Sequence, residues 1–329
     1  MPAASKSSSK RQYRDILFEV KDQVAWVTIN RPRVLNAFRE QTLDEMIDAL
    51  KSTREDPSIV CAVVTGAGNK SFSAGGDFYA MKRLNFTNAY MWNDRMLGLA
   101  MTIRGLPIPV IAMVNGWCMG GGHELALWCD LVIASENAVL GQTGAKVGAC
   151  PTVGATQYLP RIIGERLARE MIFCARRFPA KEAVEVGLIN KCVPQADLLK
   201  ETLKWCETMK GHSALTIRMT KRSLNFESDN LYSSWQHGME LLAHVWGSDE
   251  AKEGMNAFLA GRKPDFQKFR ARDKQELDRY MEGYHRDENT TPDMRGARAQ
   301  GMSVQPIKTR KPVKVAAKAA KQSRKSSRA

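Results

Sequence analysis

The chain has 329 residues, of which 43% are hydrophobic, and its formal net charge is +14. This apolar fraction is large enough for a folded core, which excludes a wholly disordered protein. The sequence contains no apolar run of about 18 residues, as a transmembrane helix would need, and its polar, basic start lacks the apolar stretch of a signal peptide. We therefore expect a soluble, cytoplasmic protein without a membrane partner.

Most of the positive charge lies at the two ends of the chain. Residues 305–329 carry nine lysines and arginines and no acidic residue, and Lys6, Lys10 and Arg11 add three more. Residues 1–13 and the charged, Lys/Ala-rich residues 271–329 are predicted to be disordered. The basic tail could bind nucleic acid or another polyanion, although a solvated extension is the commoner meaning of such a composition.

Cysteine and histidine give no sign of a metal site. The seven cysteines form no CxxC pair, and the five histidines are scattered. His123-Glu124 is followed by Leu127 where a zinc-protease helix would carry its second histidine. We expect reduced, packed cysteines and no metal.

Between the two ends, strand-like and helical segments alternate and then give way to helices. Strands are expected at residues 16–20, 24–30, 59–65 and 110–115, with helices at residues 41–52 and 89–104. Short buried strands follow at residues 131–135 and 138–141. After Pro160 the expected helices cover residues 165–174, 180–185, 198–210, 214–225, 231–245 and 250–260. This order predicts an α/β fold with a helical C-terminal region.

Two glycine-rich turns are the candidates for chemistry. The first, Ser71-Phe72-Ser73-Ala74-Gly75-Gly76-Asp77, follows the strand at residues 59–65, and the second, Gly120-Gly121-Gly122-His123-Glu124-Leu125, opens a helical stretch. The first amides of a helix lack intrahelical acceptors and lie at the positive end of its dipole. Two free amides converging on one oxygen would stabilise an enolate or a tetrahedral oxyanion, each donor contributing about 3–4 kcal/mol. Plain tight turns and a phosphate cradle are the alternatives, but the chain has no intact P-loop, no GxGxxG after its first strand and no GxSxG elbow.

Five motifs, in the same order along the chain, resemble the crotonase (enoyl-CoA hydratase/isomerase) superfamily. They occupy residues 30–37, 72–77, 114–126, 129–134 and 180–190. The resemblance implies a crotonase (ClpP-like) spiral of ββα units over residues 14–205 and a helical oligomerisation region over residues 206–270. It also implies a homotrimer or homohexamer.

The resemblance assigns roles to individual residues. It makes the amides of Gly76 and Gly121 the oxyanion hole for a coenzyme A thioester, with Glu124 beside them as the acid–base group. The residues that it places against coenzyme A or the acyl group are Arg33, Leu35, Ala37, Ser73, Ala74, Asp77, Trp117 and Thr143, with Trp117 expected in the acyl-pocket wall. Coenzyme A enters as part of the acyl-CoA substrate, and no tightly bound cofactor is implied.

Only one of the two glutamates that hydratases of this family use is present. Glu124 matches the first, whereas Gly144 stands at the place of the second. Losing one of two carboxylates should cost rate unless another group replaces it. Candidates for that replacement are Cys150, Thr143, Tyr158 and Asp77. The expected reaction is water addition to a 2-enoyl-CoA, with the enolate held in the oxyanion hole.

Three other functions fit parts of the sequence. Residues 148–160 resemble 6-oxocyclohex-1-ene-1-carbonyl-CoA hydrolases, which open a cyclic oxo-enoyl-CoA by hydrolysis, although the long insertions of that branch are missing. Residues 141–148 resemble dihydroxynaphthoyl-CoA synthases, but Ala149 and Pro151 replace the serine and aspartate that follow there. The missing second acid also fits a protein that binds coenzyme A esters without turnover.

Overall fold

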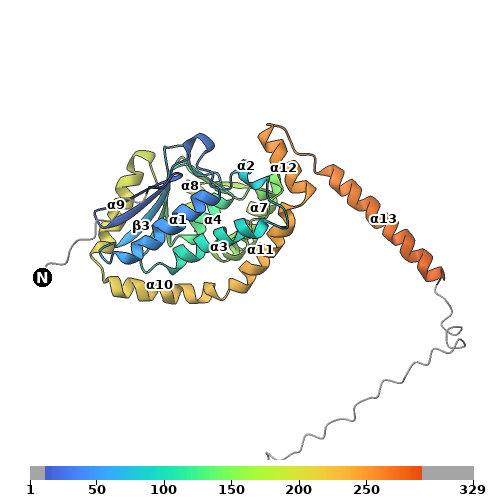
Figure 1. Cartoon of the computed structure of the whole chain (residues 1–329). Coiled ribbons are helices and arrows are strands. Elements are labelled where there is room, and N and C mark those ends of the chain that lie inside the picture. Colours follow the sequence, from blue (N-terminus) through green and yellow to red (C-terminus); the bar gives the residue numbers. More distant parts are fainter. Residues whose placement is uncertain (1–11, 291–329) are drawn as a thin grey trace, which may run out of the picture. The chain divides into compact units, whose positions relative to one another are not determined.

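The computed structural model describes residues 12–290 of the chain, and it divides into two units, Met1–Phe269 and Arg270–Ala329 (Figure 1). The basic tail at residues 305–329, with its predicted polyanion contact, lies outside the described residues. No helix in the described part of the chain combines the length and the apolar composition needed to cross a membrane. All ten strands of the described chain belong to the first unit.

The main sheet has six strands in the order β1-β2-β3-β5-β7-β10. They are β1 (Ile16–Lys21), β2 (Val24–Ile29), β3 (Cys61–Gly66), β5 (Val110–Val114), β7 (Leu131–Ser135) and β10 (Lys191–Val193). Only the β1–β2 pair is antiparallel, joined by Asp22 and Gln23 at positive φ, as a two-residue hairpin requires. The remaining pairs are parallel, and β3 is buried along its whole length, which its continuous apolar sequence predicts.

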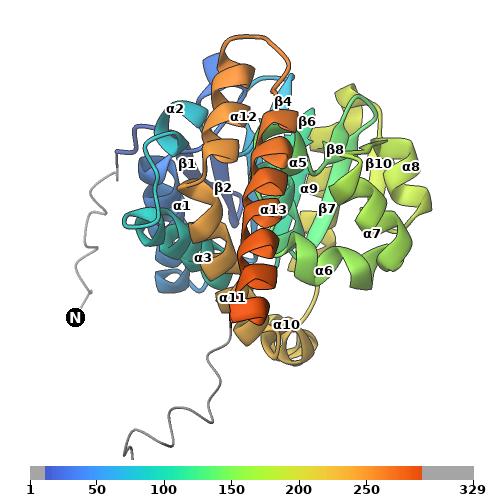
Figure 2. The same ribbon diagram turned by 90° about the vertical axis from the view of Figure 1, so that its right-hand side faces the viewer.

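A smaller second sheet repeats the order of the first. Its strands are β4 (Ser71–Ser73), β6 (Trp117–Met119), β8 (Val139–Gly141) and β9 (Arg177–Pro179), in the order β4-β6-β8-β9. In sequence, β4 follows β3, β6 follows β5 and β8 follows β7, and Figure 2 shows β6 beside β8. Each strand pair is followed by one or more helices, so the expected spiral of ββα units in an α/β fold is confirmed.

Helices cover both faces of the main sheet. On one face lie α1 (Glu40–Ser52), α3 (Ala89–Gly105) and α4 (Gly121–Trp128), which contribute to the larger apolar core. On the other face, α9 (Leu198–Lys210) buries Leu198 and Cys206 against apolar side chains of β2, β3, β5 and β7. The strands β2, β3, β5 and β7 therefore carry apolar side chains on both faces of the sheet.

The remaining helices of the first unit lie around this core and along its surface. They are α2 (Phe78–Met81), α5 (Gly144–Val147), α6 (Ala155–Ile162), α7 (Gly164–Phe173), α8 (Ala180–Glu185), α10 (Ala214–Asp229), α11 (Tyr232–Trp246) and α12 (Asp249–Leu259). The sequence predicts that the helical C-terminal region begins after Pro160, but α6 begins five residues earlier and contains the proline. The proline ring removes one donor near the C-terminal end of α6 without ending it.

The predicted disorder from residue 271 also needs correction, because α13 (Gln267–Thr290) is helical. The prediction rested on the lack of large apolar residues, and residues 271–282 are indeed exposed. The segment is instead rich in arginine, lysine and glutamate, which favour helix intrinsically. An ion pair four residues apart, between Lys274 and Asp278 (3.3 Å), adds to this tendency.

Candidate active site

The first predicted oxyanion loop, residues 73–77, runs beside the segment that ends at Phe38. The Phe38 N–H donates to the Gly75 carbonyl (2.9 Å), and the Asp77 N–H donates to the Phe38 carbonyl (2.8 Å). Both bonds are made by neighbours of Gly76, which forms an isolated parallel bridge with Phe38. In this geometry the Gly76 N–H points away from Phe38. It donates to no backbone carbonyl in the described chain and is therefore free for a ligand.

The second loop ends where α4 begins. The Gly120 N–H donates to the Gly141 carbonyl (2.9 Å), which fixes the residue before the helix, and Gly120 has a positive φ of 52°. Gly121 is the first residue of α4, so its N–H has no intrahelical acceptor. None of the described backbone carbonyls accepts from it. The positive end of the helix dipole further favours negative charge at this position.

Glycine lets the two loops approach each other closely. A Cβ atom added to Gly75 would lie 3.0 Å from the Gly121 nitrogen, and one added to Gly122 would lie 2.2 Å from the Ser73 carbonyl oxygen. The second distance is impossible for a real side chain, so backbone meets backbone here because no Cβ intervenes. The amides of Gly76 and Gly121 consequently belong to two adjoining segments.

Gly76 and Gly121 line one cavity of about 60 Å³. Its polar lining comes from Glu124 and Gln142, and its apolar lining includes two tryptophans. The full set is Phe38, Gly76, Met81, Trp92, Met96, Gly120, Gly121, Glu124, Gln142, Gly144, Ala149, Cys150, Pro151, Val153, Leu242 and Trp246. The three residues predicted to be catalytic are thus brought together around one space.

Glu124 is buried beside the oxyanion loops, with 4% of its surface exposed. It follows Gly121 by three residues, which places it on the same side of α4. Its Oε1 accepts from the Val153 N–H (2.8 Å) and from the Ala155 N–H (3.5 Å), while Oε2 has no hydrogen bond within the described residues. Burial raises the pKa of Glu124 to about 8, against the lowering effect of these two amides. A carboxyl group with such a pKa can exchange a proton with a ligand near neutral pH.

Gln142 is a cavity residue that the sequence did not single out. Its Nε2 donates to the Gly120 carbonyl (3.3 Å) and lies 3.1 Å from His123 Nδ1. Its Oε1 is buried and has no partner among the described residues. Burial lowers the pKa of His123 to about 4, so the ring is neutral and can accept from Gln142. A single glutamine forms no pattern in a sequence, and only the fold reveals its place.

Gly144, at the place of the second glutamate, leaves no room for a side chain. A Cβ atom there would lie 2.3 Å from the Ala149 carbonyl oxygen. The Ala149 N–H donates back to the Gly144 carbonyl (3.0 Å), which closes the turn around α5. Backbone therefore occupies the space into which a side chain at position 144 would extend.

The four candidate replacements for the second acid lie in different surroundings. Cys150 lines the cavity, and burial raises the pKa of its thiol. Tyr158 lies outside the cavity lining, where its ring packs against Trp235 (5.5 Å between centroids). Asp77 accepts from the Arg31 guanidinium (2.9 Å) and from the Tyr79 N–H (2.9 Å), so it caps α2. Thr143 precedes α5 and does not line the cavity.

The residues expected to contact coenzyme A lie around the oxyanion loops rather than in the cavity wall. Arg33 and Leu35 are exposed, whereas Ala37 is buried beside Phe38. The Ser73 hydroxyl donates to the Asn36 carbonyl (2.8 Å), and the Ala74 N–H donates to the Leu35 carbonyl (3.0 Å). These bonds join the segment at residues 35–38 to the first oxyanion loop.

Trp117 is not part of the cavity wall. The residue is 38% exposed, and the Arg177 guanidinium lies over its ring at 5.2 Å from the centroid. Trp92 and Trp246 contribute the aromatic surface of the cavity instead. The sequence placed Trp117 in the wall because of its position in the motif, which does not reveal the direction of a side chain.

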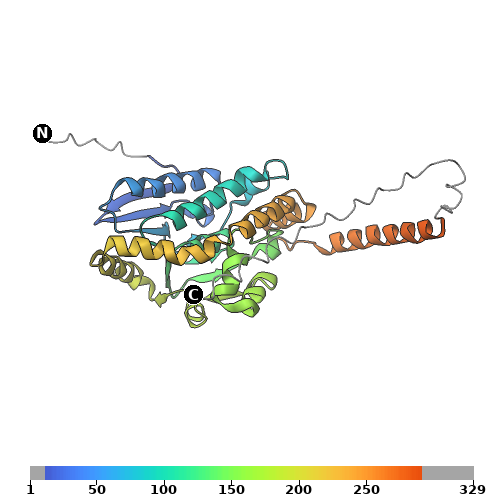
Figure 3. The same cartoon turned by 90° about the horizontal axis from the view of Figure 1, so that it is seen from below.

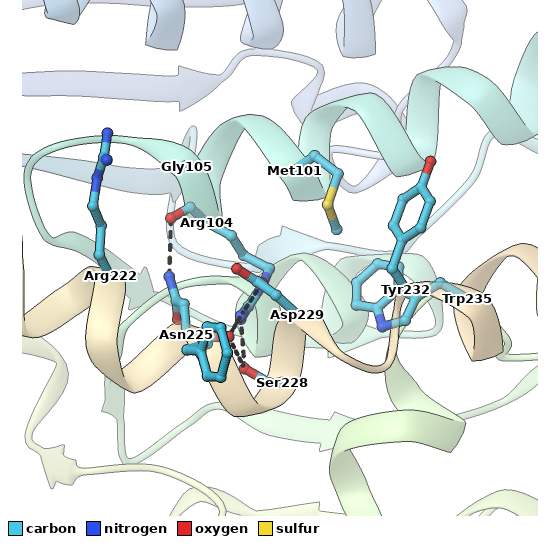
Figure 4. Close-up of a pocket in the computed structure, with 10 residues that line it drawn as sticks. Met101, Arg104, Gly105, Arg222, Asn225, Ser228, Asp229, Tyr232 and Trp235 are labelled. Atoms are coloured by element: carbon cyan, nitrogen blue, oxygen red, sulfur yellow. Dashed lines mark hydrogen bonds and ion pairs between the residues drawn. The ribbon is translucent and has the colours of Figure 1, made fainter. Parts of the chain in front are cut away.

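A larger pocket of about 480 Å³ lies between the end of α3 and helices α10 and α11 (Figure 4). There the Arg104 guanidinium donates to the Ser228 hydroxyl (2.7 Å) and to the Asp229 carboxylate (2.9 Å). None of the residues predicted to be catalytic lines this pocket. The described residues also contain no cluster of three or more histidine, cysteine or acidic side chains that could hold a metal ion. The smaller cavity is the candidate active site because it combines free amides with a carboxyl group.

Known proteins share both the sequence pattern and the fold. A family model described as enoyl-CoA hydratase/isomerase matches residues 19–270. An enoyl-CoA hydratase from Mycobacterium avium subsp. paratuberculosis K-10 is 28% identical, with a TM-score of 0.71, over 78% of this chain and 99% of that one. An enoyl-CoA hydratase/isomerase from Xanthobacter autotrophicus Py2 is 30% identical, with a TM-score of 0.70, over 76% of this chain and 98% of that one. An enoyl-CoA hydratase from Bacillus anthracis is 32% identical, with a TM-score of 0.63, over 77% and 99% of the two chains.

These matches cover both oxyanion loops, Glu124 and the helices that follow them. With the two glycine amides and the buried glutamate in one cavity, they show that this protein belongs to the enoyl-CoA hydratase/isomerase family of the crotonase superfamily.

Proposed function

We propose that the protein adds water to the double bond of a 2-enoyl-CoA thioester. The observation that carries this proposal is the presence of Glu124 in the same cavity as the free amides of Gly76 and Gly121. The thioester oxygen accepts from the two amides, which stabilise the negative charge that develops on it during addition. Because the amides are already fixed by the fold, no reorganisation is required at that moment.

Glu124 accepts a proton from the attacking water. With Oε1 held by backbone amides, Oε2 is the oxygen available to the ligand. In its ionised form Glu124 takes a proton from water while the hydroxyl bonds to the β-carbon and the π electrons move onto the thioester oxygen. The enolate then collapses as the α-carbon takes a proton either from Glu124 or from solvent, and in the second case Glu124 releases its proton to solvent. One molecule of water is consumed, and Glu124 regains its starting state.

Replacing Glu124 with glutamine tests the assignment. The amide keeps the size of the side chain but cannot accept a proton, so hydration should fall by about 10²–10⁴-fold. Glu136→Gln is the matched control, because the same change is made at an exposed position outside the cavity. Unchanged turnover by Glu124→Gln would show that another group activates the water.

The ring-opening hydrolase is the second candidate. It is favoured by one wall of the cavity, which Ala149, Cys150, Pro151 and Val153 supply from the segment that resembles that branch. Mass spectrometry of the products from linear and cyclic enoyl-CoAs separates the two functions. Addition of one water without cleavage supports the hydratase, and a ring-opened acid supports the hydrolase. Binding of these esters without any product would instead indicate a protein that holds coenzyme A esters.

We also propose that copies of the chain associate through α10. Of its sixteen residues only Lys221 is buried, and Leu215, Met219 and Phe226 are exposed. Their spacing of four and seven residues puts the three side chains on one face. A helix this exposed gains little from packing within its own chain, so a second copy is the partner that would stabilise it.

A further inference from the structure

Gln142 brings an amide group into the wall of the cavity that also contains Glu124. It follows the last residue of β8, and only 1% of its surface is exposed. Glu124 comes from α4, so two separate elements supply the polar lining of one space.

Two neighbours fix the orientation of the Gln142 amide. Its Nε2 donates to the Gly120 carbonyl (3.3 Å), and because a carbonyl oxygen can only accept, the nitrogen and not the oxygen of the amide must face it. The same nitrogen lies 3.1 Å from His123 Nδ1, which takes the second N–H. Both amide hydrogens are thus used on one side, and Oε1 is left at the other.

The Oε1 atom of Gln142 is a buried acceptor without a donor. It is shielded from solvent, and within the described chain no group donates to it. Leaving a buried carbonyl oxygen without a hydrogen bond costs free energy, so such an atom marks a place where a ligand or an ordered water belongs. The donor has to come from what the cavity holds.

The reacting part of a 2-enoyl-CoA cannot supply this donor. It consists of hydrocarbon and a thioester oxygen, and that oxygen accepts from the amides of Gly76 and Gly121. The other reactant, water, has two O–H groups. One can point to Glu124 Oε2, which has no hydrogen bond within the described residues, and the other to Gln142 Oε1.

We propose that Gln142 is a second catalytic residue, which holds the attacking water together with Glu124. This inference rests on the proposed function, because it names a residue that orients the water in that reaction. The O–H bond that faces Glu124 breaks as the oxygen bonds to the β-carbon. The O–H bond that faces Gln142 stays intact and becomes the hydroxyl group of the product. With both hydrogens directed, the water is oriented before it attacks.

This role also fits a site with one carboxyl group. Backbone occupies the space at Gly144, so an acid at that position cannot hold the water from its second side. Gln142, two residues earlier, supplies an oxygen acceptor without a second negative charge. An amide does not take up the proton, so Glu124 remains the acid–base group of the pair.

Gln142→Met tests the role in turnover, because it removes the acceptor and keeps the length of the side chain. kcat should fall about ten- to a hundredfold with a smaller change in KM, since the thioester still binds the two amides while the water is no longer oriented. Gln195→Met is the matched control. Gln195 also has a buried Oε1 without a partner in the described part of the chain, but it lies outside the cavity lining, so this variant should keep the wild-type kcat.

A binding measurement separates this role from a purely structural one. It uses Glu124→Gln, in which turnover is slow, and compares 3-hydroxybutyryl-CoA with butyryl-CoA by calorimetry. The Val153 and Ala155 amides keep an oxygen at Oε1 of position 124, so the new NH₂ group faces the ligand and cannot accept. The hydroxyl of the ester then donates to Gln142. Adding Gln142→Met should weaken binding of the hydroxy ester about five- to tenfold and change that of butyryl-CoA less than about twofold.

The outcomes distinguish this inference from the proposed reaction. Loss of affinity for the hydroxy ester alone would keep Gln142 as the hydroxyl acceptor of the site, even if no enoyl-CoA is hydrated and the proposed function fails. An unchanged ratio of the two affinities would overturn the inference, and so would a wild-type kcat in Gln142→Met.

Folding of each variant is checked by circular dichroism, and Gln142→Leu replaces Gln142→Met if the latter does not fold. If neither folds, Glu124→Gln alone decides. Tighter binding of 3-hydroxybutyryl-CoA than of butyryl-CoA supports the acceptor, and equal binding rejects it.

Discussion

The burial of Glu124 sets its charge state at the pH of the reaction. Since its pKa is raised to about 8, most molecules of the free protein carry the neutral acid at pH 7. Water activation needs the ionised form, which becomes the major species only above the pKa. The same burial strengthens the interaction of the carboxylate with a bound ligand, because the site excludes water.

The pH dependence of kcat/KM should follow this titration. We expect hydration to increase about tenfold per pH unit below the pKa and to level off above about pH 8, since kcat/KM reports the groups of the free enzyme. Steady-state kinetics between pH 6 and 9.5 would measure it. A profile that is flat across this range would mean that Glu124 is not the group that takes the proton.

Replacing Gly144 with a residue that has a side chain should not supply the missing second carboxyl group. Gly144→Ala and Gly144→Glu force a Cβ atom against the Ala149 carbonyl, so both should destabilise the fold by about 1–3 kcal/mol. Gly98→Ala makes the same chemical change inside α3, where the new methyl would meet only Ile47 Cδ1 at 3.6 Å. This control should be neutral or stabilising by up to about 1 kcal/mol. Chemical denaturation measures all three, and equal stability of Gly144→Ala and wild type would contradict the prediction.

At the level of elements, the first oxyanion loop depends on a segment more than thirty residues away. Arg31 links the two, because its guanidinium donates to the Asp77 carboxylate (2.9 Å) and contacts the Ala37 carbonyl. The Phe38 bonds to Gly75 and Asp77 then hold residues 75–77 of the loop in place. Arg31 is thus in a position to fix the Gly76 amide without touching the substrate.

Removing this link should lower the chemical rate more than the affinity. We expect Arg31→Met to reduce kcat about ten- to a hundredfold with a smaller change in KM, since a displaced oxyanion donor acts mainly on the transition state. Arg169→Met serves as control, because Arg169 pairs with Glu165 (2.9 Å) at an exposed site on α7. If Arg31→Met keeps the wild-type kcat at a temperature where it is folded, Arg31 has no positioning role.

The sequence predicted the long elements better than the short ones. The main strands and most long helices lie where apolar periodicity indicated them, whereas β4, β6 and β9 have only three residues each and carry no periodic signal. Gly76 on the one hand, and Gly121 with Glu124 on the other, could be found because each lies in a contiguous motif. Gln142 could not, because a single glutamine forms no pattern in a sequence. Trp246 could not, because α11 meets the cavity only through tertiary packing. The charged segment that forms α13 was misjudged because an apolar core was taken as a requirement for helix.

On the scale of the whole molecule, α10 is a largely exposed helix of the first unit, with only Lys221 buried. Seen from below in Figure 3, it runs along the surface of that unit. Its one buried side chain, Lys221, donates to the carbonyls of Ile103 (3.0 Å) and Ile108 (2.9 Å) and to Asp130 (2.6 Å). Arg104 of α3 also bonds Asn225, Ser228 and Asp229 near the C-terminal end of α10, while most other side chains of the helix are exposed.

Substitutions on its apolar face should therefore change the molecular mass in solution. Light scattering should give a multiple of 36.8 kDa for the wild type. Met219→Glu combined with Phe226→Glu should lower that mass, because charged side chains would have to be buried between copies. Thr220→Glu adds the same charge at an exposed position on another side of α10 and should leave the assembly intact. A wild-type protein of 36.8 kDa would reject association through this helix.

The chain order of α10 and α11 connects assembly with the acyl pocket. Only Asn230 and Leu231 separate the end of α10 from α11, which carries Leu242 and Trp246. If neighbouring copies hold α10, dilution below the dissociation constant releases it and raises the probability of local opening in the helix that follows. Specific activity would then depend on protein concentration and would fall as the enzyme is diluted.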